Sequence, residues 1–132
     1  MATIQDVRDL HHHAWKTVIA KLGPMLKSFD EPACEFEIWK NGVAGKANSV
    51  WCKYNLAYVY TNSIVDYGPT VLHEIAHVAA RRISSVRPKP HGDLFAWILR
   101  DTLGVKGQLK HSYNVTKAKL MVDLLRLQAK VA

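Results

Sequence analysis

The sequence contains little cysteine. Its 132 residues include only Cys34 and Cys52, which do not form a C-x-x-C pair. A disulfide framework or a cysteine-based zinc ribbon is therefore unsupported. Each cysteine falls in a segment with strand character, where a free thiol usually acts as a small buried hydrophobe. We expect neither cysteine to be a metal ligand or a nucleophile.

Long apolar runs are also missing. No stretch approaches the roughly 20 residues that a membrane-spanning helix needs, and the N-terminus MATIQDVRDL has acidic residues but no hydrophobic signal core. The sequence has no internal repeat, and its 48% hydrophobic and 22% charged residues are typical of globular proteins. We expect one soluble, cytoplasmic domain over residues 1–132, with no membrane partner.

The segment VLHEIAHVAARR, residues 71–82, contains the H-E-x-x-H pattern in His73, Glu74 and His77. Histidines four apart lie on one helical face, so both imidazoles can bind one Zn²⁺. Glu74 is then the candidate general base for water activated by the metal. The alternative is a helix that carries two partly exposed histidines and a solvated glutamate.

Apolar periodicity predicts an N-terminal helix over residues 4–22, ended by a Gly-Pro pair. Consecutive helical residues point about 100° apart, so His11, His12 and His13 cannot converge on one ion. We expect these three histidines to be solvated or half-buried.

Three strands and three further helices are expected after the first helix. Alternation predicts a strand over 34–38, Asn41-Gly42 predicts a hairpin turn, and further strands are expected over 43–47 and near 50–56. Helices are predicted from Gly68-Pro69 to about 83, over 94–103, and over 116–130. The predicted fold class is α+β.

Catalytic zinc usually has three protein ligands and one open position. The metzincin pattern is excluded, because Ala80 and Ile83 stand where it requires glycine and histidine. No glutamate follows Glu74, so the remaining candidates for the third ligand are His91, Asp93, Asp101, His111 and Asp123. His91 follows a loop long enough to fold back onto the helix.

Four segments resemble, in order, the SprT-like family of zinc metallopeptidases, which includes Spartan-type proteases that act on DNA-protein crosslinks. They are Val43-Ala44-Gly45, a strand that ends at Asn55, the HEIAH helix, and His91-Gly92 followed by Phe95. The resemblance covers about residues 4–103. The chain differs from longer members because it has no C-terminal cysteine-rich zinc ribbon.

The resemblance implies a small zincin-like domain, with the N-terminal helix, the three-stranded sheet, the HExxH helix and C-terminal helices. It implies Zn²⁺ as cofactor, with His73, His77 and His91 as ligands and Glu74 as the base. Asp93 then either accepts a hydrogen bond from a ligand imidazole or caps the helix that follows. The implied substrates are proteins or peptides, including proteins associated with DNA.

The charge balance favours acidic partners. Lysine and arginine outnumber acidic residues 18 to 11, which gives a net charge of +7. The candidate DNA contacts are basic residues near the motif: Arg81, Arg82, Arg87 and Lys89. A solvated basic loop is the alternative interpretation of the same residues.

Three functions remain open from the sequence. A zinc endopeptidase is favoured by Glu74, because a structural zinc site needs no carboxylate between its histidines. Its substrate could add a strand to the exposed sheet edge, and its candidate oxyanion stabilisers are Tyr113, His111 and Arg81. The alternatives are a basic nucleic-acid-binding protein braced by a structural zinc and an inactive zincin that serves as a scaffold. The oligomeric state stays open.

Overall fold

The computed structural model describes residues 1–83 and 92–105. These residues form an α+β fold with an N-terminal helix, a small mixed sheet and further helices. The elements are α1 (Ile4–Leu22), η1 (Gly23–Met25), β1 (Ala33–Glu37), β2 (Gly45–Ala47), β3 (Trp51–Asn55), α2 (Leu56–Thr61), α3 (Ile64–Ile83), α4 (Asp93–Trp97) and η2 (Ile98–Thr102). The predicted helix over 116–130 lies outside the described residues.

Helix α1 begins and ends where its sequence pattern predicts. Thr3 and Asp6 form a capping box, in which the Asp6 N–H donates to Thr3 Oγ1 at 3.1 Å and the Thr3 N–H donates to Asp6 Oδ2 at 2.9 Å. The helix buries the stripe that includes Val7, Ala14 and Val18. A single turn of 3-10 helix, η1, follows it.

The sheet has the order β1-β3-β2, so the predicted β1-β2 hairpin is wrong. Strand β1 pairs parallel with β3, and β2 pairs antiparallel with β3. Gly42 does adopt a left-handed φ of 77°, but the turn around it leads to the far side of β3. Alternation predicts which residues of a strand face the core and does not specify the partner strand.

Strands β2 and β3 are shorter than the pattern suggests, and β1 begins and ends one residue earlier than predicted. Ile38 and Val50, at the ends of two predicted strands, are 68% and 59% exposed and lie outside the observed strands. Leu56 begins α2 instead of extending β3, because the Asn55 side chain accepts the Ala57 N–H at 3.1 Å and caps that helix. Helix α2 was not predicted.

Helix α3 begins at Ile64, earlier than the predicted start at Gly68-Pro69. Ser63 caps it, since the Asp66 N–H donates to Ser63 Oγ at 3.2 Å. Pro69 is therefore inside the helix rather than in its first position. The predicted helix over 94–103 is present as α4 and the π-helical segment η2, and Gly104 follows with a left-handed φ of 74°.

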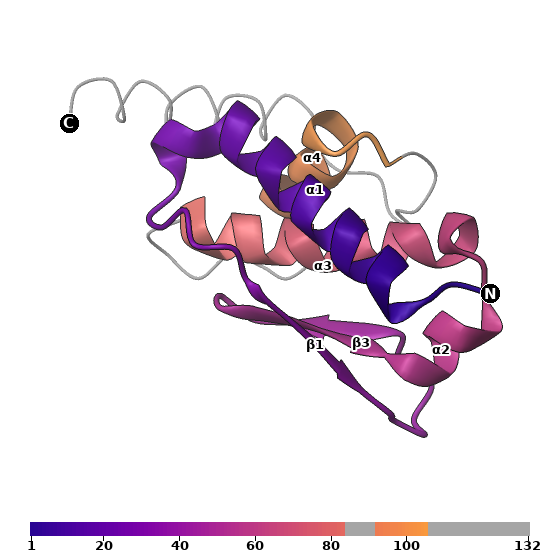
Figure 1. The fold of residues 1–132 in the computed structure, drawn as a ribbon. Coiled ribbons are helices and arrows are strands. Elements are labelled where there is room, and N and C mark those ends of the chain that lie inside the picture. Colours follow the sequence, from indigo (N-terminus) through magenta and orange to yellow (C-terminus); the bar gives the residue numbers. More distant parts are fainter. Residues whose placement is uncertain (84–91, 106–132) are drawn as a thin grey trace.

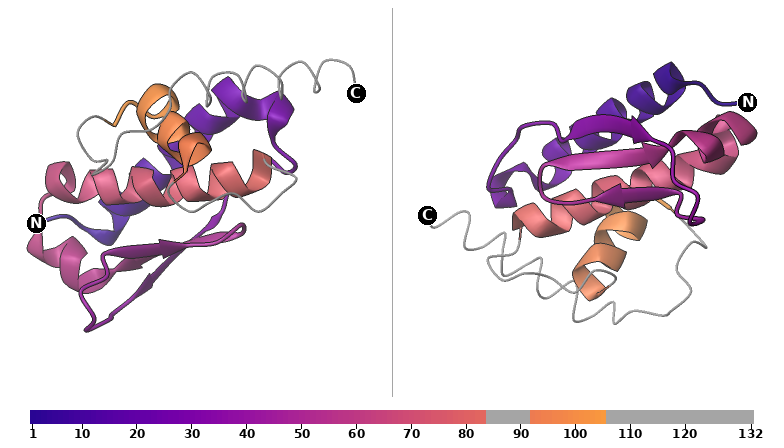
Figure 2. Two further views of the ribbon diagram at one scale, coloured as in Figure 1. Left: turned by 180° about the vertical axis from the view of Figure 1, so that it is seen from behind. Right: turned by 90° about the horizontal axis from the view of Figure 1, so that it is seen from below.

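Helices α1 and α3 lie side by side over one face of the sheet, and α4 packs on α3 on the side away from the sheet (Figure 1). None of the described helices covers the opposite face of the sheet (Figure 2). The core contains Trp15 of α1, Tyr54 of β3, Ile75 of α3 and Leu99 of η2, each at most 1% exposed. None of the described helices is both long and apolar enough to cross a lipid bilayer.

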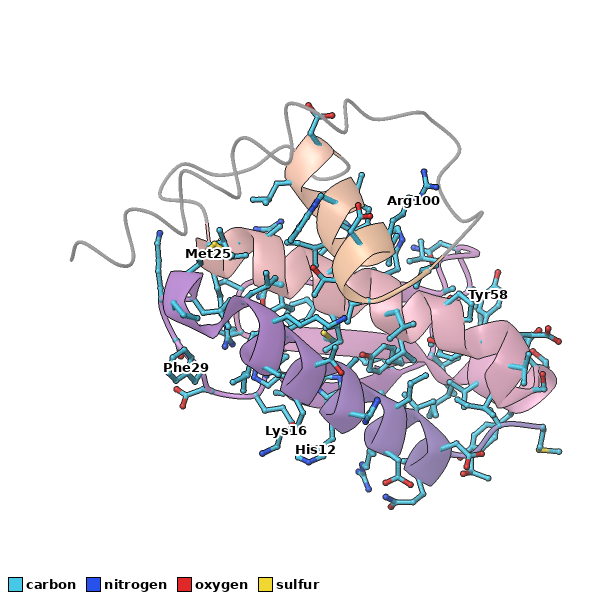
Figure 3. All side chains as sticks on the ribbon, turned by 90° about the horizontal axis from the view of Figure 1, so that it is seen from above. His12, Lys16, Met25, Phe29, Tyr58 and Arg100 are labelled. Atoms are coloured by element: carbon cyan, nitrogen blue, oxygen red, sulfur yellow. The ribbon has the colours of Figure 1, made fainter. Side chains whose placement is uncertain are left out.

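The prediction for the three consecutive histidines is wrong for His11, which is 0% exposed. Its Nε2 lies 2.7 Å from the Pro32 carbonyl oxygen and its Nδ1 lies 2.8 Å from the Tyr54 hydroxyl. These partners satisfy a neutral imidazole that donates from Nε2 and accepts at Nδ1. His12 is exposed, as predicted, on the outer side of α1 (Figure 3).

Candidate metal centre

The two histidines of the HEIAH motif bring their ring nitrogens together on one side of α3. His73 Nε2 and His77 Nε2 are 3.1 Å apart. Two imidazole nitrogens bound to one tetrahedral Zn²⁺ at 2.0–2.1 Å would be about 3.3 Å apart. Without a metal, the same separation allows one ring to donate a hydrogen bond to the other. The backbone of α3 therefore already holds both nitrogens close to the geometry that an ion requires.

Glu74 lies beside these rings but is much more buried. It is 4% exposed, and its Oε2 has no hydrogen-bond partner among the described residues. Burial raises the pKa of Glu74 to about 7. One ligand atom from each of His73, Glu74 and His77 lies within 4.8 Å of the others, so this group could bind a metal. A buried, unpartnered carboxylate oxygen is the polar group that a cation or a positioned water would satisfy.

Phe95 of α4 contacts both histidine rings. Its ring stacks on His77 with centroids 4.3 Å apart and planes at 21°, and meets His73 edge to face at 4.9 Å. Phe95 is 1% exposed, so it is held firmly in the core. The ring restricts the orientations of both imidazoles. The sequence placed Phe95 in the predicted 94–103 helix and in the family resemblance, but its packing against the histidines was not predicted.

The edge strand β2 forms the wall opposite the histidines. Its first residue, Gly45, packs against Glu74, and a Cβ at this position would lie 3.1 Å from Glu74 Cγ. The preceding Ala44 carbonyl accepts hydrogen bonds from the Tyr67 hydroxyl at 2.7 Å and from the Asn55 N–H at 3.0 Å. The start of β2 is therefore fixed next to the motif helix by residues of α3 and β3.

Asn55 organises the loop that leads into β2. Its Nδ2 donates to the carbonyl oxygens of Trp39 at 3.0 Å and Val43 at 2.8 Å, and the residue is 0% exposed. Asn55 thus connects the end of β3, the cap of α2 and the 39–43 loop. Its role in positioning the edge strand explains why a buried asparagine is used at the end of β3.

A groove of about 450 Å³ lies between β2 and α3. Its lining combines the motif side chains with residues of both elements: Gly45, Lys46, Ala47, Trp51, His73, Glu74, His77 and Arg81. A smaller cavity of about 210 Å³ borders Pro69, Thr70 and the same His73 and Glu74. The candidate ligands and Glu74 are therefore reached from an open surface beside a sheet edge.

The other predicted site residues are only partly described. His91, the predicted third ligand, and the alternatives His111 and Asp123 lie outside the described residues. Asp93 is the first residue of α4 and is half-buried, whereas Asp101 of η2 is exposed. The cap position of α4 is Gly92, so the alternative that Asp93 caps this helix is wrong. The third ligand stays a prediction.

The candidate DNA contacts that the structure describes, Arg81 and Arg82, have different environments. Arg81 lines the groove. Arg82 is 7% exposed, lies over the Trp15 ring, and donates to the carbonyl oxygens of Ser49 at 2.9 Å and of Asp30. Its guanidinium is fully engaged in the fold, so the prediction that Arg82 contacts DNA is withdrawn. Arg87 and Lys89 lie outside the described residues.

The two cysteines agree with the expectation that they are structural. Both are free; Cys52 is buried and Cys34 is half-buried. Burial raises the pKa of the Cys34 thiol to about 11 and raises that of Cys52 further. Both thiols therefore stay protonated at neutral pH, which disfavours roles as nucleophile or zinc ligand.

Comparisons of the chain with models of protein families, with curated proteins and with solved structures found no match.

Proposed function

We propose that this protein is a zinc-dependent endopeptidase of the zincin type, similar to the SprT-like family, with His73 and His77 as ligands and Glu74 as general base. The observation that carries the proposal is the combination of two ring nitrogens 3.1 Å apart with a buried carboxylate oxygen that has no partner among the described residues. A site used only to brace the fold would need the nitrogens but not this carboxylate. His91 is the proposed third ligand.

The donor set is suited to Zn²⁺, since neutral imidazole is one of its preferred ligands. When bound, zinc would supply Lewis-acid chemistry, polarising a substrate carbonyl and making water more acidic. The chain's own residues then have separate tasks. Glu74 takes a proton from the attacking water and passes it to the leaving amine. Gly45 brings the backbone of β2 to within contact of the Glu74 side chain, which fixes the carboxylate in place.

Substrate binding is assigned to the edge strand. Strand β2 is paired only with β3 in the described sheet, so its other edge has no strand partner there, and its residues Gly45–Ala47 line the groove. An extended peptide can add to such an edge by main-chain hydrogen bonding. Because β2 lines the same groove as His73 and His77, a peptide bound there would pass directly by the candidate ligands.

The alternative of a nucleic-acid-binding protein with a structural zinc is less well supported. It was based on the +7 charge and on four basic residues near the motif. Of these, Arg82 is committed to backbone carbonyls inside the fold. Arg81 lines a groove that also contains the candidate base. We retain DNA-associated proteins as a proposed class of substrate and test DNA as an additive.

The test is zinc content and proteolysis of purified wild type and Glu74→Gln. Casein and a DNA-binding protein would be incubated with each protein, with and without DNA and with and without a chelator. We expect Glu74→Gln to keep about one zinc per chain, since zinc coordination is assigned to the histidines, and to lose roughly 10²-fold to 10⁴-fold in rate, which is typical for loss of a general base.

Asp66→Asn is the matched control, because Asp66 is an exposed acid in the first turn of the same helix. This control should keep wild-type zinc and activity. Full activity of Glu74→Gln would exclude its role as base, and loss of zinc in that variant would mean that Glu74 is a ligand. An inactive wild type with bound zinc would favour the scaffold function.

A further inference from the structure

The groove beside the candidate metal ligands is lined by cations. Lys46 of β2 and Arg81 of α3 border it, and the only carboxylate among its described lining residues belongs to Glu74. Glu74 is 4% exposed, so it contributes little negative charge to the open surface of the groove. The open part of the groove is therefore positively charged.

Arg81 is the cation best placed to bind a ligand. It follows His77 by four residues, so it lies on the same face of α3, one helical turn beyond that histidine. Across residues 1–83 and 92–105, no carboxylate lies within ion-pair distance of its guanidinium. Lys46 differs, because its Nζ lies 4.4 Å from the centroid of the Trp39 ring. The adjacent Arg82 differs too, since backbone carbonyls occupy its guanidinium.

We infer that Arg81 is a specificity-determining residue that binds the carboxylate of an Asp or Glu side chain in an extended peptide lying along β2. This inference rests on the proposed function, because it takes the groove to be the substrate site. An arginine guanidinium binds a carboxylate through two parallel N–H donors, which favours this group over neutral isosteres. The preferred substrate class is therefore acidic peptide segments.

The spacing of α3 also predicts where the acidic residue lies. Arg81 is one turn beyond His77, a rise of about 5.4 Å along the helix axis. Successive side chains on one face of an extended peptide are about 6.6–6.8 Å apart. When the scissile bond lies beside the histidines, a peptide side chain two positions away therefore lies beside Arg81. A peptide is favoured over a nucleic acid here because one wall of the groove is the edge strand of the described sheet, to which an extended backbone can add.

The experiment measures binding of fluorescent peptides to the full chain carrying Glu74→Gln, loaded with zinc, so that binding is read without hydrolysis. Peptides of one length would carry Glu, Gln or Lys two positions from the central bond, on either side. We expect the Glu peptide to bind at least about 10-fold more tightly than the Gln peptide at one of these positions, as a charge-assisted hydrogen bond predicts. Arg81→Gln should remove this preference, and Arg81→Lys should keep only part of it.

Arg8→Gln is the charge-matched control. Arg8 is exposed on α1 and lies over Phe36 of β1, at the sheet edge opposite β2. This variant should keep the full preference for Glu. Equal binding of the Glu and Gln peptides, or a preference that survives Arg81→Gln, would overturn the inference. Tight binding of a single-stranded oligonucleotide that depends on Arg81, together with no preference for Glu, would overturn it in favour of phosphate.

Hydrolysis by the wild-type chain separates this inference from the proposed function. A wild type that prefers the Glu peptide in binding but cleaves none of the peptides leaves the role of Arg81 intact and rejects the endopeptidase. A wild type that cleaves Glu and Gln peptides at equal rates and binds them equally supports the endopeptidase and rejects the role of Arg81.

Discussion

Gly45 of β2 and Glu74 of α3 approach so closely that a side chain at position 45 would crowd the Glu74 side chain. A Cβ at position 45 would lie 3.1 Å from Glu74 Cγ and 3.2 Å from Thr70 Cγ2. The candidate base is thus held by the backbone of the strand that we propose to bind substrate. Catalytic side chains positioned by rigid elements are more precise than those on loops.

Gly45→Ala should displace the Glu74 carboxylate while leaving the histidines in place. We expect peptidase activity to fall by at least about 10-fold, since a shift near 1 Å at a catalytic group can cost up to about 10²-fold. Zinc content should stay at the wild-type level. Gly23→Ala is the control, because its added Cβ would meet nothing closer than 3.9 Å at a helical φ. Unchanged activity of Gly45→Ala would show that the contact does not position the base.

Phe95→Leu should weaken zinc binding while the chain stays folded. Replacing the buried ring by a smaller apolar side chain leaves a small cavity, and we expect it to lower the free energy of unfolding by about 1–2 kcal/mol. Loss of the aromatic ring frees the orientation of both imidazoles, and we expect about 10-fold weaker zinc binding by competition with a chromogenic chelator. Leu99→Met, a core change in η2, should leave zinc affinity unchanged. Wild-type affinity in Phe95→Leu would refute a positioning role for Phe95.

Removal of His91 tests the third ligand, which the described residues do not include. His91→Ala should lose most of its zinc and part of its thermal stability, because metal binding is coupled to folding. Asp93→Ala should keep zinc, with affinity about 10-fold to 100-fold weaker if Asp93 orients a ligand imidazole. Metal analysis of both proteins beside wild type is the measurement. The reverse pattern would make Asp93 the ligand and would argue against the SprT-like resemblance.

The buried His11 should make the fold sensitive to mild acid. Burial lowers the pKa of His11 in the folded state below its ordinary value of 6.5, so protons bind more readily to the unfolded chain. The free energy of unfolding contributed by His11 is therefore complete above pH 6.5 and is lost as the pH falls from 6.5 through the lower folded-state pKa. The slope can reach about 1.4 kcal/mol per pH unit.

Urea unfolding of the zinc-free wild type and of His11→Gln would measure this effect. The pH range would run from about 8 to about 5, which is about one and a half units on either side of the ordinary histidine pKa. The difference between the two proteins isolates His11. This comparison is necessary because Glu74 has the opposite effect. Its pKa is raised from the ordinary value of 4.5 to about 7 in the folded state, so the free energy of unfolding falls as the pH rises through this range. A pH-independent difference between the two proteins would exclude His11 as the acid-sensitive group.

The sequence by itself determined the features that depend on local periodicity and capping. The stripe of α1 fixed its extent from Ile4 to Leu22, and the HEIAH spacing fixed both ring nitrogens on one face of α3. These follow from 3.6 residues per turn and need no knowledge of distant residues. The α+β class followed in the same way, from one helical segment, several alternating segments and further helical ones.

Only the tertiary structure decided which elements meet. Strand β1 pairs with β3 instead of β2, because alternation identifies a buried face but not the neighbour that covers it. The same limit explains why residues of one type that are adjacent in sequence differ in burial. Arg82 is buried against Trp15 and carbonyls while Arg81 borders the groove, and His11 is buried while His12 is exposed. Helical neighbours point about 100° apart, so the packing partner of each face, supplied by distant segments, determines which of them is solvated.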